Sequence, residues 1–217
     1  MDILFLDDSL IVVNKPSGLL TIRDGYNPDL PTVKSILEKD FGRCWIVHRL
    51  DKETSGALIV ARNEFSHRNL NISFGNRQIH KIYHAIISGT PPEKEFDITL
   101  PLRIDGDRRH RTVIDFEHGK HATSHIKVIT FYKECSLVSV KPESGYTHQI
   151  RVHLSSSGFP ILGDALYKND KSLQLNIIDR TALHASQISF IHPVSNLPNT
   201  IRADYPDDFQ LALTSTY

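Results

Sequence analysis

The sequence predicts an α+β protein with a mixed, largely antiparallel central sheet, flanked by helices and loops. Segments of strand character outnumber helical segments along the 217 residues. The two kinds do not alternate regularly, as they would in a doubly wound parallel fold. The composition, with 40% apolar and 23% charged residues, is ordinary for a soluble globular chain. Together these observations favour one compact domain over residues 1–217.

The first forty residues predict a hairpin and a helix. The apolar runs Ile3–Leu6 and Leu10–Val13 are separated by an Asp-Asp-Ser turn signal, which is typical of two paired strands. Asp29 and Pro31 then open a helix that continues to Phe41, because proline is favoured near the first helical position.

The rest of the chain predicts mainly strands. Ala57–Ala61 is a continuous apolar run of strand length, so we expect it to be fully buried. The segment from Glu64 to Gln78 lacks proline and is expected to be helical, whereas His80–Ser88 alternates as a strand does. Residues 147–157 predict a short helix that ends at Gly158. Further strands are expected at Ala122–Phe131, Ser136–Lys141, Ala182–Phe190 and Thr200–Ala203.

Several classes of protein are excluded by what the sequence lacks. No apolar run approaches the roughly 20 residues of a membrane-spanning helix, and the first residues, MDILFLDDSL, lack the basic start of a signal peptide. Cys44 and Cys135 are too few for a disulfide framework and suit free thiols in a reducing compartment. The motifs GxSxG, GxxxxGK[ST], GxGxxG and CxxC are absent. We therefore expect a cytoplasmic protein.

Charge is unevenly distributed although the total is zero, with 25 Lys and Arg against 25 Asp and Glu. Residues 41–87 carry seven basic residues against three acids, and residues 103–127 carry six against four, with four histidines. Salt screens each patch beyond ~8–10 Å, so a neutral protein can still bind phosphates on one face. The alternative is that these charges are simply solvated.

The twelve histidines do not form a convincing metal site. His80 and His84 are four residues apart on a predicted strand, which separates them by roughly 13 Å at ~3.3 Å per residue. His118, His121 and His125 are loosely spaced in a glycine-containing segment, so solvated or phosphate-facing histidines are favoured.

Residues 45–56 concentrate polar chemistry directly before the predicted buried strand. They contain two acids, two bases, hydroxyls and a glycine in one connection between apolar segments. Polar residues on a rigid scaffold are typical of functional sites. From the residues alone, a salt-bridged turn between Asp51 and Arg49 or Lys52 remains the alternative.

The segment HRLDKETSG at 48–56 resembles the signature of the RluA family of RNA pseudouridine synthases. Five further segments resemble motifs of that family in the same order: VNKPSGLL at 13–20, KIYHA at 81–85 with Gly89, SGYTHQIRVHL at 144–154, PILGD at 160–164 with Tyr167, and LHA at 183–185 with His192-Pro193. DFEHGK at 115–120 is similar to the founding, dual-specificity branch for ribosomal and transfer RNA. Tyr146 departs from the family, which usually has arginine there.

The resemblance implies a reaction and the residues that perform it. Uracil leaves its ribose, turns over and is rejoined through carbon 5, which requires no cofactor and no metal. Asp51 matches the catalytic aspartate, as attacking nucleophile or as promoter of elimination, and Arg151 matches the residue that pairs with it. Tyr83 matches the tyrosine that stacks on the flipped base, and Arg49 the residue that enters the vacated space.

The resemblance also implies the partner. We expect RNA, as a transfer-RNA anticodon stem-loop, a large-subunit ribosomal RNA hairpin or both, with phosphate contacts from Arg108, Arg109 and Arg111. We further expect a monomer without a membrane or obligate protein partner, and no separate N-terminal RNA-binding domain. The alternatives are a catalytically idle RNA-binding protein on the same fold, or a carboxylate-dependent nucleosidase.

Overall fold

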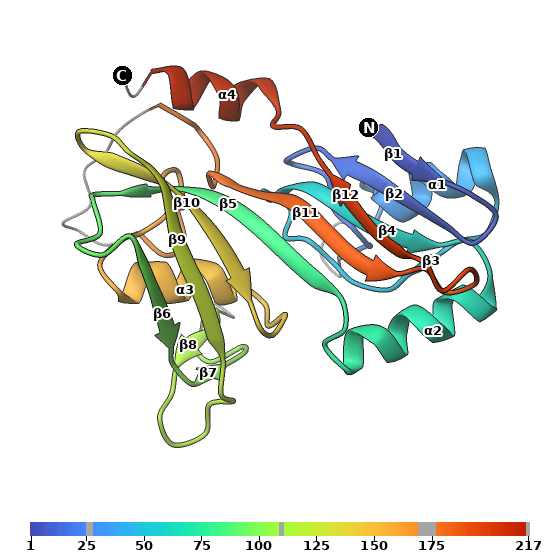
Figure 1. The fold of residues 1–217 in the computed structure, drawn as a ribbon, viewed down its shortest axis with the longest axis horizontal. Coiled ribbons are helices and arrows are strands. Elements are labelled where there is room, and N and C mark those ends of the chain that lie inside the picture. Colours follow the sequence, from blue (N-terminus) through green and yellow to red (C-terminus); the bar gives the residue numbers. More distant parts are fainter. Residues whose placement is uncertain (25–27, 109–110, 169–176, 216–217) are drawn as a thin grey trace. The chain divides into compact units, whose positions relative to one another are not determined.

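A computed structural model describes residues 1–24, 28–108, 111–168 and 177–215 (Figure 1). Contacts divide the chain into two compact units. The first unit comprises Met1–Lys81 and His184–Tyr205, and the second comprises Ile82–Leu183 and Pro206–Tyr217. The single domain expected from the sequence stays a prediction.

The first unit contains a mostly antiparallel sheet with strand order β1-β2-β4-β11-β12, in which β3 also pairs with β4. Its strands are β1 (Asp2–Leu6), β2 (Leu10–Lys15), β3 (Trp45–Ile46), β4 (Ser55–Ala61), β11 (Leu183–Ile191) and β12 (Pro198–Arg202). The predicted hairpin is β1–β2, and the β4–β11 pair is parallel. Its helices are α1 (Val33–Phe41) and α2 (Glu64–Gly75).

The helix starts are determined by capping residues. The side chain of Thr32 accepts a hydrogen bond from the Ser35 amide (3.0 Å), and the Ser35 hydroxyl accepts one from the Thr32 amide (2.9 Å). The prediction that Asp29 and Pro31 open α1 is therefore wrong by a few residues, because this reciprocal capping box satisfies the exposed amides at Thr32. Helix α2 begins as predicted, after the capping residue Asn63, but ends at Gly75 rather than Gln78.

Strand β4 is the centre of the first unit. All seven of its residues are buried, which confirms the fully buried strand predicted from the apolar run. Its apolar side chains pack into a core with Leu10, Val12, Leu70, Ile188 and Phe190. The polar loop before β4 is therefore attached to a rigid strand.

The second unit contains an antiparallel sheet with strand order β5-β10-β9-β6. The strands are β5 (His80–Ser88), β6 (Glu95–Thr99), β9 (Thr123–Phe131) and β10 (Cys135–Pro142), and a separate hairpin is formed by β7 (Leu102–Arg103) and β8 (Val113–Ile114). The helices are α3 (Gln149–Ser156) and α4 (Asp207–Thr214). The predicted α+β class with a largely antiparallel sheet is thus confirmed.

Short or mostly exposed elements were not predicted, namely β3, β6, β7, β8 and α4. In β6 only Ile98 is buried, so the strand has too few apolar residues to be detected. Both cysteines are buried free thiols, as expected. No helix of the described residues is long and apolar enough to cross a membrane.

Candidate active site

The loop that carries Asp51 is anchored by a buried lysine of the first unit. Lys15 is fully buried, and its ammonium group donates hydrogen bonds to the carbonyls of Pro16 (2.9 Å), Leu19 (2.7 Å) and Lys52 (3.0 Å). A buried ammonium group is tolerated only when its donors are satisfied, so these three carbonyls are held close together. The residue directly after Asp51 is thereby fixed to the segment at 15–19.

Two hydroxyl groups hold the same loop on either side of Asp51. Ser17 donates to the carbonyl of Glu53 (2.8 Å), and Thr21 donates to the carbonyl of Leu50 (3.0 Å). Asp51 itself is half-buried. Because the backbone around it is held by side chains, its position depends little on what its own carboxylate contacts.

The end of the loop lies tightly against β11. Gly56 has a φ of +113°, and a Cβ there would lie 2.3 Å from the carbonyl oxygen of Ala185, so only glycine fits. Ser55 Oγ lies 2.9 Å from His184 Nδ1, and His184 Nε2 lies 3.1 Å from the Ala203 carbonyl. Since a carbonyl only accepts, His184 carries its proton on Nε2 and accepts from Ser55 at Nδ1.

The other polar residues of the loop differ in exposure. Arg49 is exposed, whereas Thr54 is buried and its hydroxyl has no hydrogen-bond partner among the described residues. His48 Nε2 accepts the Ile59 amide of β4 (2.9 Å), and its ring lies 4.7 Å from that of Phe74. Burial, and secondarily the nearby Lys81 ammonium, lower the pKa of His48 to about 3, so it is neutral and supports the loop.

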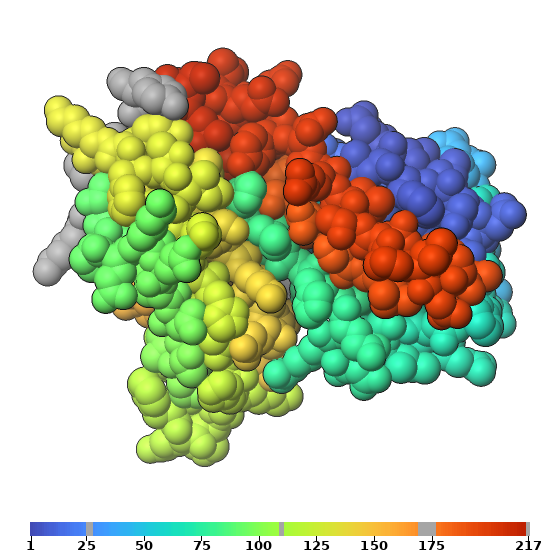
Figure 2. All heavy atoms as spheres, in the orientation of Figure 1, coloured from blue at the N-terminus to red at the C-terminus, as the bar shows by residue number. Residues whose placement is uncertain are grey.

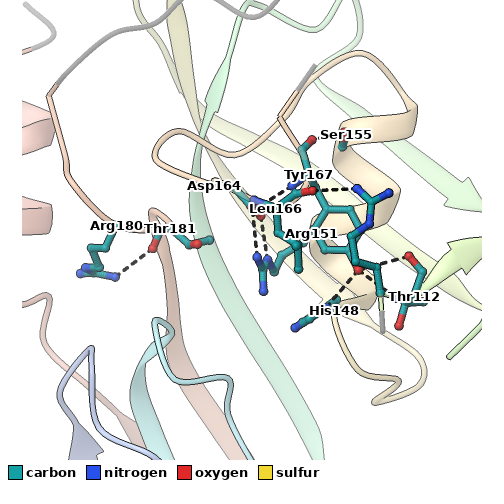
Figure 3. A network of polar contacts seen from close by, with 10 residues as sticks. Thr112, His148, Arg151, Ser155, Asp164, Leu166, Tyr167, Arg180 and Thr181 are labelled. Atoms are coloured by element: carbon teal, nitrogen blue, oxygen red, sulfur yellow. Dashed lines mark hydrogen bonds and ion pairs between the residues drawn. The ribbon is translucent and has the colours of Figure 1, made fainter. Parts of the chain in front are cut away.

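In the second unit, Arg151 of α3 forms a buried ion pair with Asp164 (Figure 3). Its Nε donates to Oδ2 at 2.7 Å and its Nη2 donates to Oδ1 at 2.8 Å. Asp164 also accepts the backbone amides of Leu166 (2.9 Å) and Tyr167 (3.1 Å). The guanidinium group therefore has one fixed orientation.

Tyr167 supports Arg151 from a second direction. Its hydroxyl accepts the Thr112 amide (3.0 Å), donates to the Thr112 carbonyl (3.1 Å) and lies 3.0 Å from His148 Nδ1. Burial raises its pKa to about 12. The guanidinium carbons of Arg151 and Arg111 lie 5.1 and 5.9 Å from the centre of the ring, within cation–π range.

Two further tyrosines occupy the second unit. Tyr83 lies on β5 opposite Val140 of β10, and only 9% of it is exposed. Tyr146 packs against the small apolar cluster of Leu102, Ala122, Val152 and Tyr167. The residue that replaces the family arginine thus contributes apolar packing at this position.

The three predicted phosphate-binding arginines differ in their surroundings. Arg108 is exposed, and Arg109 lies outside the described residues. Arg111 is bound within the unit, because its Nε pairs with Asp107 (2.7 Å) and its Nη1 donates to the Leu166 carbonyl (3.0 Å). Their phosphate contacts stay a prediction.

The site residues are thus distributed over both units. Arg49 and Asp51 share one loop of the first unit, and Tyr83 and Arg151 belong to the second, so the Asp51–Arg151 pair stays a prediction. Sequence reasoning did not assign roles to Lys15, Asp164 and Tyr167. All three lie in motifs quoted for the resemblance, but nothing in the sequence says which groups they contact. Among the described residues, no group of three or more His, Cys, Asp or Glu side chains could hold a metal ion.

A family sequence model, related sequences and a solved structure all match this chain over most of its length, and they describe the same class of protein. The sequence model of a family described as RNA pseudouridylate synthase matches residues 9–156. The ribosomal large subunit pseudouridine synthase D of Zymomonas mobilis is 37% identical, over 97% of this chain and 71% of the relative. The dual-specificity RNA pseudouridine synthase RluA of Escherichia coli is 35% identical, over 95% of this chain and 93% of the relative. The solved structure of human RNA pseudouridylate synthase domain containing 4 matches with a TM-score of 0.79 at 25% identity, over 98% and 91% of the two chains.

Proposed function

The chain belongs to the RluA family of RNA pseudouridine synthases and isomerises uridine in RNA, and on this premise we propose that Asp51 is its catalytic carboxylate and short RNA hairpins are its substrates. The observation that carries the proposal is the anchoring of the Asp51 loop by Lys15, Ser17 and Thr21. Catalytic groups need a fixed position, and here side-chain bonds to the backbone supply it.

The reaction is balanced without any external reagent. The bond between N1 of uracil and C1′ of ribose breaks, a bond between C5 and C1′ forms, the C5 proton leaves and N1 gains a proton. A carboxylate at Asp51 serves either as a nucleophile at C1′ or as a base that promotes elimination. Neither route needs a cofactor, and we propose that the protein uses none.

The remaining site residues are proposed to act on the flipped nucleotide. Arg151 pairs with Asp51 and keeps it ionised, in an orientation that Asp164 already fixes. Tyr83 stacks on the extruded uracil, and Arg49, which is exposed, enters the space that the base has left.

Substrate choice is proposed to rest on a transfer-RNA anticodon stem-loop, a large-subunit ribosomal RNA hairpin or both. The relative from Escherichia coli is named for dual specificity and the one from Zymomonas mobilis for the ribosomal large subunit, at similar identities to this chain. Sequence identity therefore does not decide between ribosomal RNA alone and dual specificity. Exposed Arg108, with Arg109 and Arg111, is proposed to contact phosphates along the stem.

The test is modification of synthetic hairpins of about 15–20 nucleotides, which is enough for a splayed loop on a short stem. Release of tritium from uridine labelled at C5 reports the reaction, and mapping of pseudouridine in cellular RNA with and without the protein identifies the position. We expect tritium release with no free uracil. Release of free uracil would indicate a nucleosidase. RNA binding without tritium release would indicate an idle RNA-binding protein. Modification of assembled ribosomal particles alone, and not of hairpins, would contradict recognition of a short loop.

A further inference from the structure

The turn at residues 115–119 presents an aromatic side chain that the proposed function does not use. Phe116 is 79% exposed, the highest value among the large apolar side chains of the described residues. Its neighbours along the chain, Asp115, Glu117 and His118, are polar. A phenylalanine that is almost fully exposed gains little hydrophobic stabilisation on folding, so its ring is available for contact with a ligand.

The backbone on either side of Phe116 is held rigidly. The carboxylate of Asp115 accepts the amides of Glu117 (3.0 Å) and His118 (2.9 Å) through Oδ1. Its Oδ2 pairs with Arg103 Nε of β7 at 2.7 Å. Every one of these contacts holds the turn in place, and none of them covers the ring of Phe116.

The end of the turn is equally constrained. A Cβ at Gly119 would lie 2.2 Å from the Asp115 carbonyl oxygen and 2.8 Å from the Pro101 carbonyl carbon, so only glycine fits. Lys120 and Leu102 exchange two backbone hydrogen bonds, each 2.8 Å long. The side chain of Phe116 is thus presented on a preformed support. In Figure 2 the yellow-green atoms of this stretch of chain lie at the lower end of the second unit.

The surroundings of Phe116 fit a nucleic acid better than a protein. Protein-docking surfaces have a contiguous apolar centre, whereas this turn offers a single ring. Lys120, His118 and His121 are exposed in this stretch of chain, beside the exposed carboxylate of Glu117, and Arg103 is half-exposed although it pairs with Asp115. An aromatic face next to cationic groups is the arrangement that binds an unpaired base with its phosphates, because every base has a stacking face.

We propose that Phe116 stacks on an unpaired base of the RNA substrate, at a site separate from the uridine that is isomerised. This inference rests on the proposed function, in which Tyr83 stacks on the target uracil. Phe116 would then contribute affinity and choice of loop, and it takes no part in the chemical step. The fixed turn favours this role, because little conformational freedom is lost on binding.

The test compares Phe116→Ala, Phe116→Leu and Phe116→Trp for binding to RNA hairpins, or to total transfer and ribosomal RNA if no hairpin is modified. Loss of one stacked base weakens binding by about 5- to 150-fold, so we expect this range for Phe116→Ala. Phe116→Leu should weaken RNA binding nearly as much as Phe116→Ala, because leucine is apolar but has no ring to stack on a base. Phe116→Trp should bind at least as tightly as the wild type, and turnover on saturating RNA should be unchanged in all three.

The matched control is Phe131→Ala. Phe131 is also an exposed phenylalanine of the second unit (48% exposed), and it is the last residue of β9. This substitution should leave RNA binding unchanged. A second reporter is Phe116→Trp combined with Trp45→Phe, which leaves one tryptophan. RNA should quench its fluorescence through stacking.

The outcomes distinguish this inference from the proposed function. Wild-type affinity for RNA in Phe116→Ala would overturn base stacking. Equal affinity of Phe116→Leu and the wild type would also overturn it, and would indicate an apolar contact such as one with a protein partner. If the wild type binds RNA but forms no pseudouridine in it, the proposed substrate is wrong, and the binding comparison still decides the role of Phe116.

Discussion

Asp164 holds the guanidinium group of Arg151 through two hydrogen bonds of 2.7 and 2.8 Å, thirteen residues away along the chain. The carboxylate is buried, and it accepts two backbone amides at the same time. The arginine that the proposed mechanism requires is therefore positioned before any RNA binds.

Asp164→Asn is expected to lower the free energy of unfolding by about 3–5 kcal/mol, because it removes the buried carboxylate that pairs with the Arg151 guanidinium group. Pseudouridine formation should fall in the protein that remains folded. Urea denaturation and tritium release measure the two effects. As a control, Asp208→Asn alters the pair with Arg180, in which the carboxylate is half-exposed, and should cost less. Unchanged stability in Asp164→Asn would contradict the importance of the pair.

Asp51→Asn is expected to abolish pseudouridine formation, because the amide neither attacks the ribose nor accepts a proton. Stability and RNA binding should be retained, since the loop is held through its backbone by Lys15. The assays are tritium release, RNA binding and thermal unfolding. Asp8→Asn, in which a fully exposed side chain undergoes the same substitution, is the control. Turnover within about tenfold of the wild type, a change of only ~1.4 kcal/mol in barrier, would rule out Asp51 as the catalytic group.

Tyr83→Phe is expected to reduce turnover more than RNA binding, because the ring that stacks is kept and only the hydroxyl is removed. Tyr83→Ala should weaken both, since it also removes the stacking surface, worth about 1–3 kcal/mol. Single-turnover rates and dissociation constants separate the two effects. Equal and small effects of both substitutions would assign Tyr83 to the scaffold of β5.

Acid is expected to destabilise the protein partly through His48. Its pKa is about 3 in the folded protein and near 6.5 when unfolded, so the unfolded chain binds more protons between these values. The contribution of His48 to the free energy of unfolding is complete above pH 6.5. It is lost as the pH falls below that value, by about 1.4 kcal/mol per pH unit. His48→Gln still accepts the Ile59 amide but does not titrate. Its free energy of unfolding should fall less steeply between pH 6.5 and 4.5, and equal slopes would contradict the burial of a neutral His48.

RNA binding is expected to weaken steeply with salt, and Arg108→Ala and Arg111→Ala should each reduce the slope of log K against log salt by about one. Turnover on saturating RNA should stay close to the wild type. Arg111→Ala should also lower stability, because Asp107 and Tyr167 lose a partner. Lys39→Ala, at the end of α1, is a control for a general loss of positive charge. An unchanged salt slope in Arg108→Ala would exclude a phosphate contact there.

Long, regular patterns predicted the fold well, and short ones did not. The uniform apolar run at Ala57–Ala61 and the alternation at His80–Ser88 each indicate a strand, and both strands, β4 and β5, are present. Helix α4 was missed because only Phe209 and Ala212 are buried in its eight residues, too few for a helical period to be recognised. The capping of α1 at Thr32 depends on the approach of the Thr32 hydroxyl to the Ser35 amide, which the sequence pattern does not reveal.

The sequence by itself determined the family, the core strands and the segments in which the proposed site residues occur, because these depend on local patterns and on motifs in a fixed order. Only the tertiary structure decided which groups meet. Lys15 binds the carbonyl of Lys52, and Asp164 binds Arg151, across 37 and 13 residues of chain. A buried charge is stable only where the fold brings oppositely charged or hydrogen-bonding partners to it. That convergence is a property of the packed chain, which no local stretch of sequence contains.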